Sequence, residues 1–517
     1  MIGPDKETTV LHSSPVKSAS FVAGLSPAAT VAVIGAVLGI LAYGLLTFGI
    51  WPRHDFPLFG TDIYDRYYLS LLDGRFDLPA TVLRYEGHYA PDGTGYLYHG
   101  VAPLLTRFAF GWLVPLDRVS LAPFSVWFWA CLGSLFYHKL FHDLTIRFWP
   151  QGAANRYWPL LLAALVWVAT PGLLIAVNPA LFHEPIAVGY AASAGLLYAF
   201  ARWRFLGGSW VVAIIAMAAW AALSLHARPN LAIGLYAATM LMCLGMLLEH
   251  RRQALFSIVM ALSILGASGL GYLALNKLKF GSVGATHGSF SESGVQYGPV
   301  FWGLEDEDSE RARAFARHGK FNIRRVPSNL AVYALDPPPA FGETPIRMMN
   351  ALHEKAMASG LGFIRIENPR IGFVYLWLPW LVMIVVAIGM RRFWQGMISV
   401  IPVLAGTAIS AALTLSYATI ALRYRFDLWP FIAALAVMAC PVIVPRLAAW
   451  LADGRRIVAI LVLVFSINMS LVTAVSYSQS FREEPSGFFA PWSIETCRER
   501  AMAKGLPAER IDAVCMK

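Results

Sequence analysis

Long apolar segments separated by polar loops run through most of the chain. A helix that spans a membrane needs roughly 20 mostly apolar residues. The hydropathy pattern therefore predicts an all-α polytopic membrane protein with about eleven transmembrane helices. We expect these helices at residues 27–50, 121–141, 158–177, 186–203, 210–225, 231–248, 254–275, 371–389, 397–417, 428–444 and 457–476.

A twelfth apolar segment, residues 101–114, is shorter and is interrupted by Pro103 and Arg107. Proline removes a helical hydrogen bond, and an arginine is costly in a lipid-facing span. We interpret this segment as a re-entrant or interfacial helix rather than as a further span.

Positively charged residues collect in every second loop, and loops of this kind stay on the cytoplasmic side of a membrane. This predicts a cytoplasmic N-terminus and, with an odd number of spans, a C-terminus on the outer side. The charges that define the inner loops are Lys139, Arg147, Arg156, Arg202, Arg204, Arg251, Arg252, Arg391, Arg392, Arg446, Arg455 and Arg456.

The predicted topology divides the chain into five parts. The first apolar segment is long enough to remain as an uncleaved anchor. The parts are a cytoplasmic tail (1–26), an N-terminal transmembrane module (27–276) that carries a first outer loop (51–120), a large periplasmic loop (277–370) before the last four spans, the C-terminal transmembrane helices (371–477) and a periplasmic tail (478–517).

Composition supports a membrane protein and excludes several other classes. Hydrophobic residues make up 57% of the 517 residues and charged residues only 14%, against about 25% charged in soluble domains. The net charge of +10 is spread beside apolar segments, so we expect membrane lipid and no nucleic acid as a partner. The chain contains no Walker loop, dinucleotide-binding glycine pattern or zinc-protease motif.

The five cysteines have no metal-binding spacing. Cys131, Cys243 and Cys440 lie in apolar segments and are expected to be buried. Cys497 and Cys515 lie in the polar C-terminal tail. A tail outside the cytoplasm would allow these two to form a disulfide, and the sequence leaves the free and the bonded forms equally open.

Four polar clusters converge on the predicted outer face. Ionisable groups at membrane depth are expensive and are usually paired or functional. Each cluster also has a structural explanation, such as a helix cap, an ion pair or a lipid headgroup contact, but four clusters on one face favour a functional site. They are Asp62 with Asp65, His183 with Glu184, His226 with Arg228, and Arg423 with Arg425 and Asp427.

These residues fit the transfer of a sugar from a lipid phosphate. A carboxylate can act as general base for an attacking hydroxyl, and arginines recognise phosphate through bidentate hydrogen bonds. We expect Asp62, with Asp65 as second candidate, to be catalytic. The expected substrate-binding residues are Arg66, Tyr67, Glu86, His88, Tyr98, His99, His183, Glu184, His226, Arg228, Asn230, Arg423, Tyr424, Arg425 and Asp427. No metal site is predicted, because two carboxylates such as Asp62 and Glu184 do not establish a divalent cation.

Several short stretches resemble the GT-C superfamily of polytopic glycosyltransferases, which use polyprenyl-phosphate-linked sugars. The similarity is greatest to the bacterial family-39-like, or dolichyl-phosphate-mannose-transferase-like, membrane proteins. It implies a catalytic Asp on short interfacial helices in the first outer loop, a position that Asp62 matches, and a lipid-phosphate donor that arrives laterally between helices. The stretches are 62–79, 96–105, 182–184, 227–230, 280–282 and 423–430.

The chain departs from related patterns at two points. No Asp-Glu pair follows the first span, unlike in protein mannosyltransferases and aminoarabinose transferases, and the Trp-Trp-Asp signature of oligosaccharyltransferases is absent. The resemblance therefore leaves the acceptor class open.

The sequence leads to one principal functional hypothesis and two alternatives. The principal one is an inverting glycosyltransferase with a polyprenyl-phosphate sugar donor and a glycan or glycolipid acceptor, at the periplasmic face of a bacterial inner membrane. The first alternative is an O-antigen-type polymerase or ligase that uses a lipid-linked oligosaccharide, which the large loop at 277–370 keeps open. The second is a lipid-linked glycan flippase or transporter, which would require charged residues within several spans.

Overall fold

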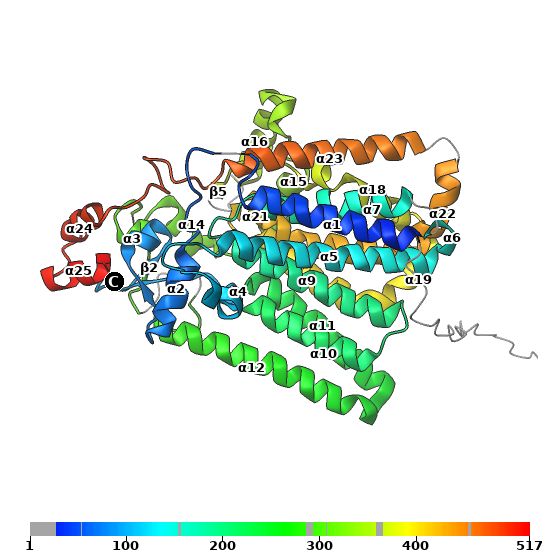
Figure 1. Cartoon of the computed structure of the whole chain (residues 1–517), viewed down its shortest axis with the longest axis horizontal. Helices are drawn as coiled ribbons and strands as arrows, with labels where there is room; N and C mark the ends of the chain where they lie inside the picture. Colours follow the sequence, from blue (N-terminus) through cyan, green and yellow to red (C-terminus); the bar gives the residue numbers. More distant parts are fainter. Residues whose placement is uncertain are drawn as a thin grey trace, which may run out of the picture.

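A computed structural model describes residues 27–516 except 53, 154–156, 286–292, 307, 358–364 and 453–455. Within these residues the fold is a long helical bundle with a mixed α/β head at one end (Figure 1). The helical character expected from the sequence is confirmed, but the chain is mostly helical rather than all-α, because short strands of two residues each lie in the head and its surroundings.

The bundle contains the long apolar helices. They are α1 (Pro27–Thr47), α5 (Ala122–Phe148), α7 (Tyr157–Val168), α8 (Pro171–Ala176), α9 (His183–Arg204), α10 (Trp210–Leu225), α11 (Pro229–His250), α12 (Leu255–Phe280), α18 (Leu378–Ile388), α20 (Ile401–Ser416), α22 (Trp429–Ala452) and α23 (Arg456–Ser478). The short helices α6 (Pro150–Ala153), α17 (Phe373–Leu376) and α19 (Arg391–Met397) connect them.

The number of spans expected from the sequence is not confirmed. In the described part of the chain, five helical segments are long and apolar enough to cross a membrane: Pro27–Thr47, Pro229–Phe280, Arg391–Ser416, Leu422–Arg446 and Ile457–Ser478. The expected span at 158–177 is divided into α7 and α8 because Pro171 begins a new helix. Conversely, Pro229–Phe280 reverses direction at Arg251, where φ is +49°, so this one segment supplies both α11 and α12.

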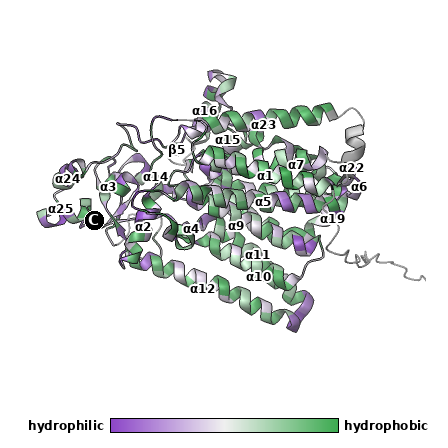
Figure 2. Cartoon of the chain, in the orientation of Figure 1, coloured by the Kyte–Doolittle hydropathy of each residue, from purple (hydrophilic) through white to green (hydrophobic). Residues whose placement is uncertain are grey.

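The outer surface of the bundle is apolar, as Figure 2 shows along α1, α12 and α23. Leu41 on α1 is 59% exposed, Leu270 on α12 is 71% exposed and Leu461 on α23 is 62% exposed. Contiguous exposed apolar surface of this size is unfavourable in water and suits contact with lipid. Together with the apolar segments, this surface makes the chain a membrane protein.

Close helix packing in the bundle depends on small residues. A side chain at Gly234 of α11 would lie 2.1 Å from the carbonyl oxygen of Gly406 on α20, and one at Gly406 would lie 2.3 Å from that of Gly234. Such glycines let two helix backbones approach closely in a membrane. We infer that this contact sets the relative position of α11 and α20, which both reach the site described below.

The head contains short elements from three distant parts of the sequence. Its helices are α2 (Ile63–Leu72), α3 (Ala80–Leu83), α4 (Leu104–Phe110), α13 (Gly298–Phe301), α14 (Glu310–His318), α24 (Ile494–Ala503) and α25 (Ala508–Met516). The first outer loop thus forms short helices, and residues 101–114 form α4 and the 3₁₀ turn η2 (Gly111–Leu113). Beside the head lie α15 (Val326–Leu335), α16 (Glu343–Met357) and α21 (Leu422–Arg425).

A small antiparallel sheet joins the first outer loop to the segment after α12. Its strand order is β1 (Asp77–Leu78), β3 (Gly95–Tyr96), β2 (His88–Tyr89) and β4 (Gln296–Tyr297), with His88 opposite both Tyr96 and Tyr297. A separate parallel pair joins β5 (Arg365–Ile366) to β6 (Thr419–Ile420). The two pairings bring residues 296–297 and 365–366 to the end of the bundle.

The C-terminal tail is fixed on the head. Cys497 and Cys515 form a disulfide between α24 and α25. The sequence left the free and the bonded forms open, and the structure has the bonded form. Arg510 donates to Asp92 at 2.6 Å, and the rings of Trp492 and Tyr85 meet edge to face. Cys131, Cys243 and Cys440 are free and buried, as expected.

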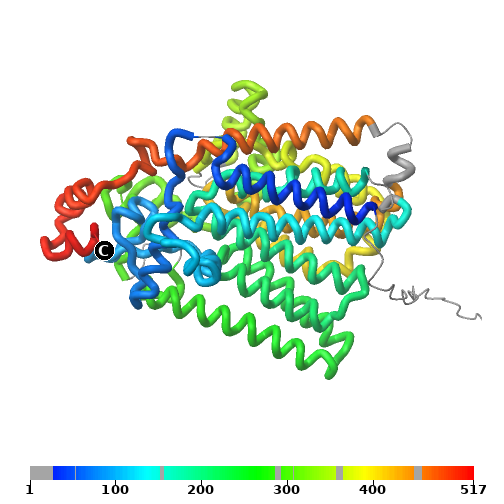
Figure 3. The backbone as a smooth tube through the Cα atoms, in the orientation of Figure 1, coloured from blue at the N-terminus to red at the C-terminus, as the bar shows by residue number. Residues whose placement is uncertain are grey.

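The ends of the described chain lie at opposite ends of the bundle. Figure 3 shows α1 beginning far from the head and the C-terminus lying on it. Asp62 belongs to the head, and Arg251 lies in the turn between α11 and α12 at the other end. The side chain of Asp62 is 51% exposed, and Arg251 is exposed.

We therefore expect cysteines introduced at positions 62 and 251 to react from opposite sides of the membrane. The measurement is labelling of intact cells and of inverted vesicles with a membrane-impermeant thiol reagent. Position 62 should be labelled in cells and position 251 in inverted vesicles. Labelling of both positions from one side would contradict the arrangement.

Candidate functional site

The four polar clusters meet where the head joins the bundle. The amide of Leu181 donates to the carbonyl of Phe59 at 3.1 Å, and the amide of Ala102 donates to that of His226 at 2.7 Å. These backbone contacts connect the first outer loop to the starts of α9 and α11. The convergence expected from the sequence is thus present in the structure.

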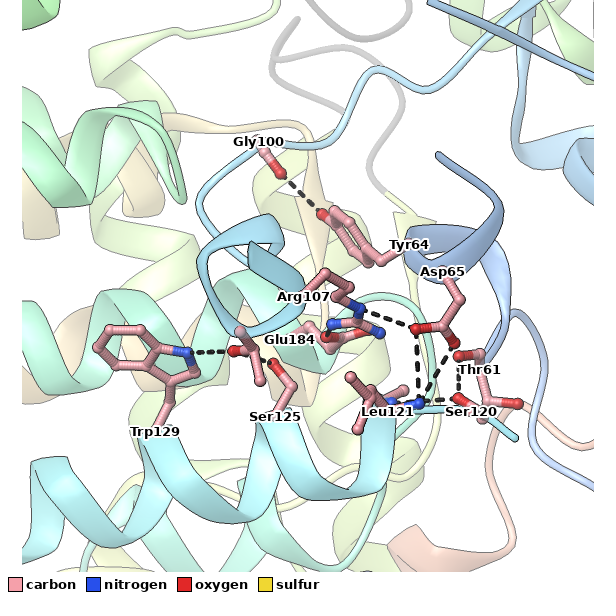
Figure 4. Close-up of polar contacts among 12 residues, drawn as sticks. Thr61, Tyr64, Asp65, Gly100, Arg107, Ser120, Leu121, Ser125, Trp129 and Glu184 are labelled. Atoms are coloured by element: carbon pink, nitrogen blue, oxygen red, sulfur yellow. Dashed lines mark hydrogen bonds and ion pairs between the residues drawn. The ribbon is translucent and has the colours of Figure 1, made fainter. Parts of the chain in front are cut away.

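A buried ion network lies at this junction (Figure 4). The guanidinium of Arg107 on α4 donates from Nε to Asp65 on α2 at 2.9 Å, and from Nη1 and Nη2 to Glu184 at the start of α9. All three side chains are fully buried. The backbone amide of Leu121, just before α5, also approaches Asp65 at 3.3 Å. Arg107 therefore joins three segments of the chain, and Asp65 links a fourth to them.

The ion network fixes the positions of its own side chains. Both carboxylates are held by one guanidinium, whose other face is covered by the ring of Tyr64, 5.6 Å away. Burial raises the pKa of Asp65 to about 6, the Arg107 cation opposes this rise, and Glu184 adds to it. Asp65, the second catalytic candidate, is thus bonded to Arg107 and sealed from solvent.

Asp62 lies at the start of α2, toward solvent. Its side chain is 51% exposed and stands 3.7 Å from Arg66, one helical turn further on. Tyr64 and Tyr67 of α2 are buried. Asp62 and Asp65 are three residues apart, but Asp62 is half-exposed whereas Asp65 is fully buried against Arg107.

Two neighbouring pockets lie beside this network. The first, which we call the cationic pocket, is lined by Arg228, Lys320 and Arg423 and by one carboxylate, Asp427. Several predicted substrate-binding residues share its wall: His88, Tyr98, His99, Arg228, Asn230, Arg423, Tyr424 and Asp427. From the bundle, α12 contributes Tyr272, Asn276 and Phe280.

The second pocket, which we call the acidic pocket, is lined by Glu86 and Glu367 together with arginines and aromatic rings. Arg423 binds Glu367 at 2.7 Å. The two pockets share five lining residues, Tyr98, Phe182, Tyr417, Arg423 and Tyr424, which we call the shared wall.

Burial controls the charge of the titratable groups at these pockets. It lowers the pKa of His88 to about 3, with smaller contributions from Lys279 and Lys320, and it lowers the pKa of His99 well below its usual range. Both imidazoles are therefore neutral at pH 7. Burial also lowers the pKa of Lys320 to about 8 and raises the pKa of Glu86 to about 7.

The remaining predicted site residues lie outside the two pockets. Asp62, Asp65, Arg66, Tyr67 and Glu184 belong to the face of α2 or to the ion network. His183 is buried, with Nε2 2.6 Å from the hydroxyl of Tyr477. Arg425 is buried against Asp336 at 3.3 Å. His226 contributes its carbonyl to the contact with Ala102.

In the described residues, no group of three or more His, Cys, Asp or Glu side chains is arranged so that it could hold a metal ion. Asp62 and Glu184, the pair considered above for a divalent cation, each interact with a different arginine.

Sequence reasoning missed several lining residues from the large loop and the tail. Lys320, Glu367 and Arg365 come from the loop at 277–370, and Phe488 and Phe489 come from the C-terminal tail. Only Arg365 and Glu367 had a sequence signal, because they lie in the polar stretch 365–369 directly before an expected span. The contacts that place the loop residues join positions far apart in the chain: the bridge between Phe321 and Tyr417 lies beside Lys320, and the strand pair β5–β6 holds Arg365 and lies beside Glu367.

Comparisons with known proteins show a similarity in fold to a solved structure. No protein-family model matches the chain, and no curated protein matches it. Among solved structures, the fold is similar to the archaeal oligosaccharyltransferase AglB from Archaeoglobus fulgidus, which was solved in complex with an inhibitory peptide and a dolichol-phosphate. The sequences are 13% identical, the match covers 95% of this chain and 59% of AglB, and the TM-score is 0.49.

Replacing Arg107 with Met should strongly destabilise the protein. The change leaves two buried carboxylates without a cation, and breaking a buried pair typically costs about 3–5 kcal/mol. We expect a large fall in the thermal unfolding temperature of the purified protein. Arg118→Met is the control, because Arg118 is 82% exposed and should change stability by less than about 0.5 kcal/mol. Equal unfolding temperatures for the two variants would contradict the role of Arg107.

Asp65→Asn should change how stability depends on pH. The pKa of Asp65 is about 6 in the folded protein against 3.8 ordinarily, so the folded state binds its proton more tightly. Its contribution to stability is therefore present below about pH 4, is lost as the pH rises to about 6, and is then constant. Unfolding temperatures measured from pH 4 to pH 8 should show this decline in the wild type and a flatter curve in the variant. Parallel curves would contradict the assignment.

Proposed function

We propose that the protein is an inverting glycosyltransferase that moves a sugar from a polyprenyl-phosphate donor to a glycan or lipid acceptor at the periplasmic face of a bacterial inner membrane. The observation that carries this proposal is the shared wall. It places a pocket with three cations and one carboxylate directly beside a pocket in which two carboxylates, Glu86 and Glu367, lie among three arginines. A phosphate leaving group and an attacking hydroxyl need such neighbouring environments.

The cationic pocket suits the phosphate of the donor. Three cationic side chains and one carboxylate line it, so its net charge favours an anion. Arginine forks form paired hydrogen bonds with phosphate oxygens, and fixed cations stabilise the negative charge that grows on a departing phosphate. Arg228 and Arg423 are held in place by Asp427 and Glu367, which keeps these donors preorganised.

Helix α12 suits the lipid part of the donor. Tyr272 and Asn276 of this helix line the cationic pocket. On the same helix Leu270 is 71% exposed and Leu273 is 43% exposed on the apolar surface of the bundle. A polyprenyl chain can therefore lie in the lipid along α12 while its phosphate occupies the pocket.

Two features support an outer location for the head. The Cys497–Cys515 disulfide lies in the tail fixed on the head, and disulfides persist in oxidising compartments such as the bacterial periplasm. The other end of the bundle carries exposed arginines, including Arg251, Arg252 and Arg391, as cytoplasmic loops do.

The polymerase or ligase alternative has one supporting observation. The large loop contributes Lys320 to the cationic pocket and Arg311 to the acidic pocket, and additional cations suit a diphosphate-linked donor. The chemical identity of the lipid that accumulates without the protein distinguishes the two functions.

Cells that lack the protein should lose one monosaccharide unit from an envelope glycan or glycolipid. They should accumulate the corresponding polyprenyl monophosphate sugar, and mass spectrometry of lipid and glycan extracts detects both changes. Wild-type protein should restore the glycan. Arg423→Gln should restore it about 100-fold to 1,000-fold more slowly, because one preorganised donor to the leaving phosphate is lost.

The matched control is Arg324→Gln, which removes an exposed arginine beside the head and should restore the glycan normally. Accumulation of an oligosaccharide diphosphate lipid would favour the polymerase or ligase. Unchanged extracts would contradict both functions.

A further inference from the structure

Glu86 differs from the other carboxylates around the two pockets. Asp62, Asp65, Asp427 and Glu367 each form an ion pair with an arginine. Among the described residues Glu86 forms no such pair, and its carboxylate accepts a hydrogen bond from the hydroxyl of Tyr297. Glu86 is nevertheless buried, with 6% of its surface exposed, and it lines the acidic pocket.

The backbone around Glu86 is tightly held. Glu86 ends the 3₁₀ turn η1 (Arg84–Glu86), and Arg84 adopts a φ of +51°, which is unusual for a residue with a side chain. Arg84 is fixed by Glu483 at 3.1 Å. On the other side, a side chain at Gly298 would lie 2.4 Å from the carbonyl oxygen of Tyr85. Backbone strain held in place by its surroundings is a common feature of functional sites.

Glu86 also lies next to the shared wall. Tyr98 and Arg423 line both pockets, and each interacts electrostatically with Glu86. A group bound in the acidic pocket beside Glu86 therefore lies next to the wall that faces the cationic pocket.

The lining of the acidic pocket indicates the class of molecule that it binds. The rings of Tyr297, Tyr417 and Phe488 provide apolar faces, while Glu367 and Asn368 provide hydrogen-bonding groups. Flat apolar faces with a few fixed polar groups suit a sugar, which has both C–H faces and hydroxyls. A lipid acceptor would need a more apolar lining than this one.

We propose that the acidic pocket binds a carbohydrate acceptor and that Glu86 is the base that removes the proton from its attacking hydroxyl. This inference rests on the proposed glycosyl transfer. The acceptor oxygen forms a bond to the anomeric carbon of the donor as the bond from that carbon to the phosphate oxygen breaks. The bonding electrons leave with polyprenyl phosphate. The hydroxyl proton moves to the Glu86 carboxylate, which later releases it to water.

The environment of Glu86 is consistent with this role. Burial raises its pKa to about 7, and Glu367 adds to the rise, while Arg423, Arg365 and the hydrogen bond from Tyr297 oppose it. A general base is most effective when its pKa lies near the working pH. Only the deprotonated form can accept a proton, so turnover should increase with pH through about 7. Above about pH 8 it should fall again, because Lys320 of the cationic pocket then loses its charge.

The direct test is Glu86→Gln, which preserves size and removes the base. Purified protein is supplied with the lipid fraction and the glycan fraction from cells that lack it, and transfer is followed by mass spectrometry. Turnover should fall about 10²-fold to 10⁴-fold, with the KM for the glycan changed by less than about threefold. Asp62→Asn is the comparison that tests the base expected from the sequence. Near-normal turnover of Glu86→Gln, or loss in Asp62→Asn alone, would refute the role of Glu86.

A second measurement keeps the test decisive if Glu86→Gln fails to fold. Tyr297→Phe removes the hydrogen bond that lowers the pKa of Glu86, so the rise of turnover with pH should move to a higher pH than in the wild type. A wild-type profile without this rise, or one that Tyr297→Phe leaves in place, would overturn the inference. Wild-type protein that transfers no sugar would instead refute the proposed function, and this inference with it.

Discussion

The guanidinium of Arg107 is the interaction on which the arrangement of the site depends. It joins Asp65 on α2 to Glu184 on α9 while remaining fully buried. A buried guanidinium is stable only when its hydrogen bonds are satisfied, so the three segments must come together for any of them to be well placed. The junction of head and bundle therefore forms cooperatively, and its geometry sets the positions of the pockets beside it.

The charged groups have different roles, and these roles follow from this junction. Carboxylates inside the ion network are saturated by Arg107 and hold the fold together. In the pockets, Asp427 and Glu367 hold arginines in fixed orientations, which leaves the cations preorganised for an anion. Among the described residues, Glu86 lines the acidic pocket without an ion pair to an arginine, and burial raises its pKa more than the nearby Arg423 and Arg365 lower it.

The sequence predicted the parts of this site that lie beside membrane helices. Arg228, Asn230, Arg423 and Asp427 were recognisable because a charged or polar residue next to an apolar segment is conspicuous. Lys320 and Glu367 were not, because the Phe321–Tyr417 bridge and the strand pair β5–β6 that place their segments are set by tertiary contacts rather than by local pattern. The span count is not confirmed in part for a similar reason, since the break at Pro171 does not interrupt the hydrophobic pattern. The reversal at Arg251, by contrast, falls on the polar residues at which the sequence already predicted a loop.

Asp62 and Glu86 show how the choice of a catalytic carboxylate changes once exposure is known. By its place after the first span, Asp62 was the best match to a catalytic position, yet its half-exposed side chain forms an ion pair with Arg66. Asp62 also lies outside both pockets. Glu86, by contrast, lines the acidic pocket, and burial raises its pKa to about 7. If the acceptor binds in the acidic pocket, proton affinity and position therefore both favour Glu86, which sequence alone marked only as a binding residue.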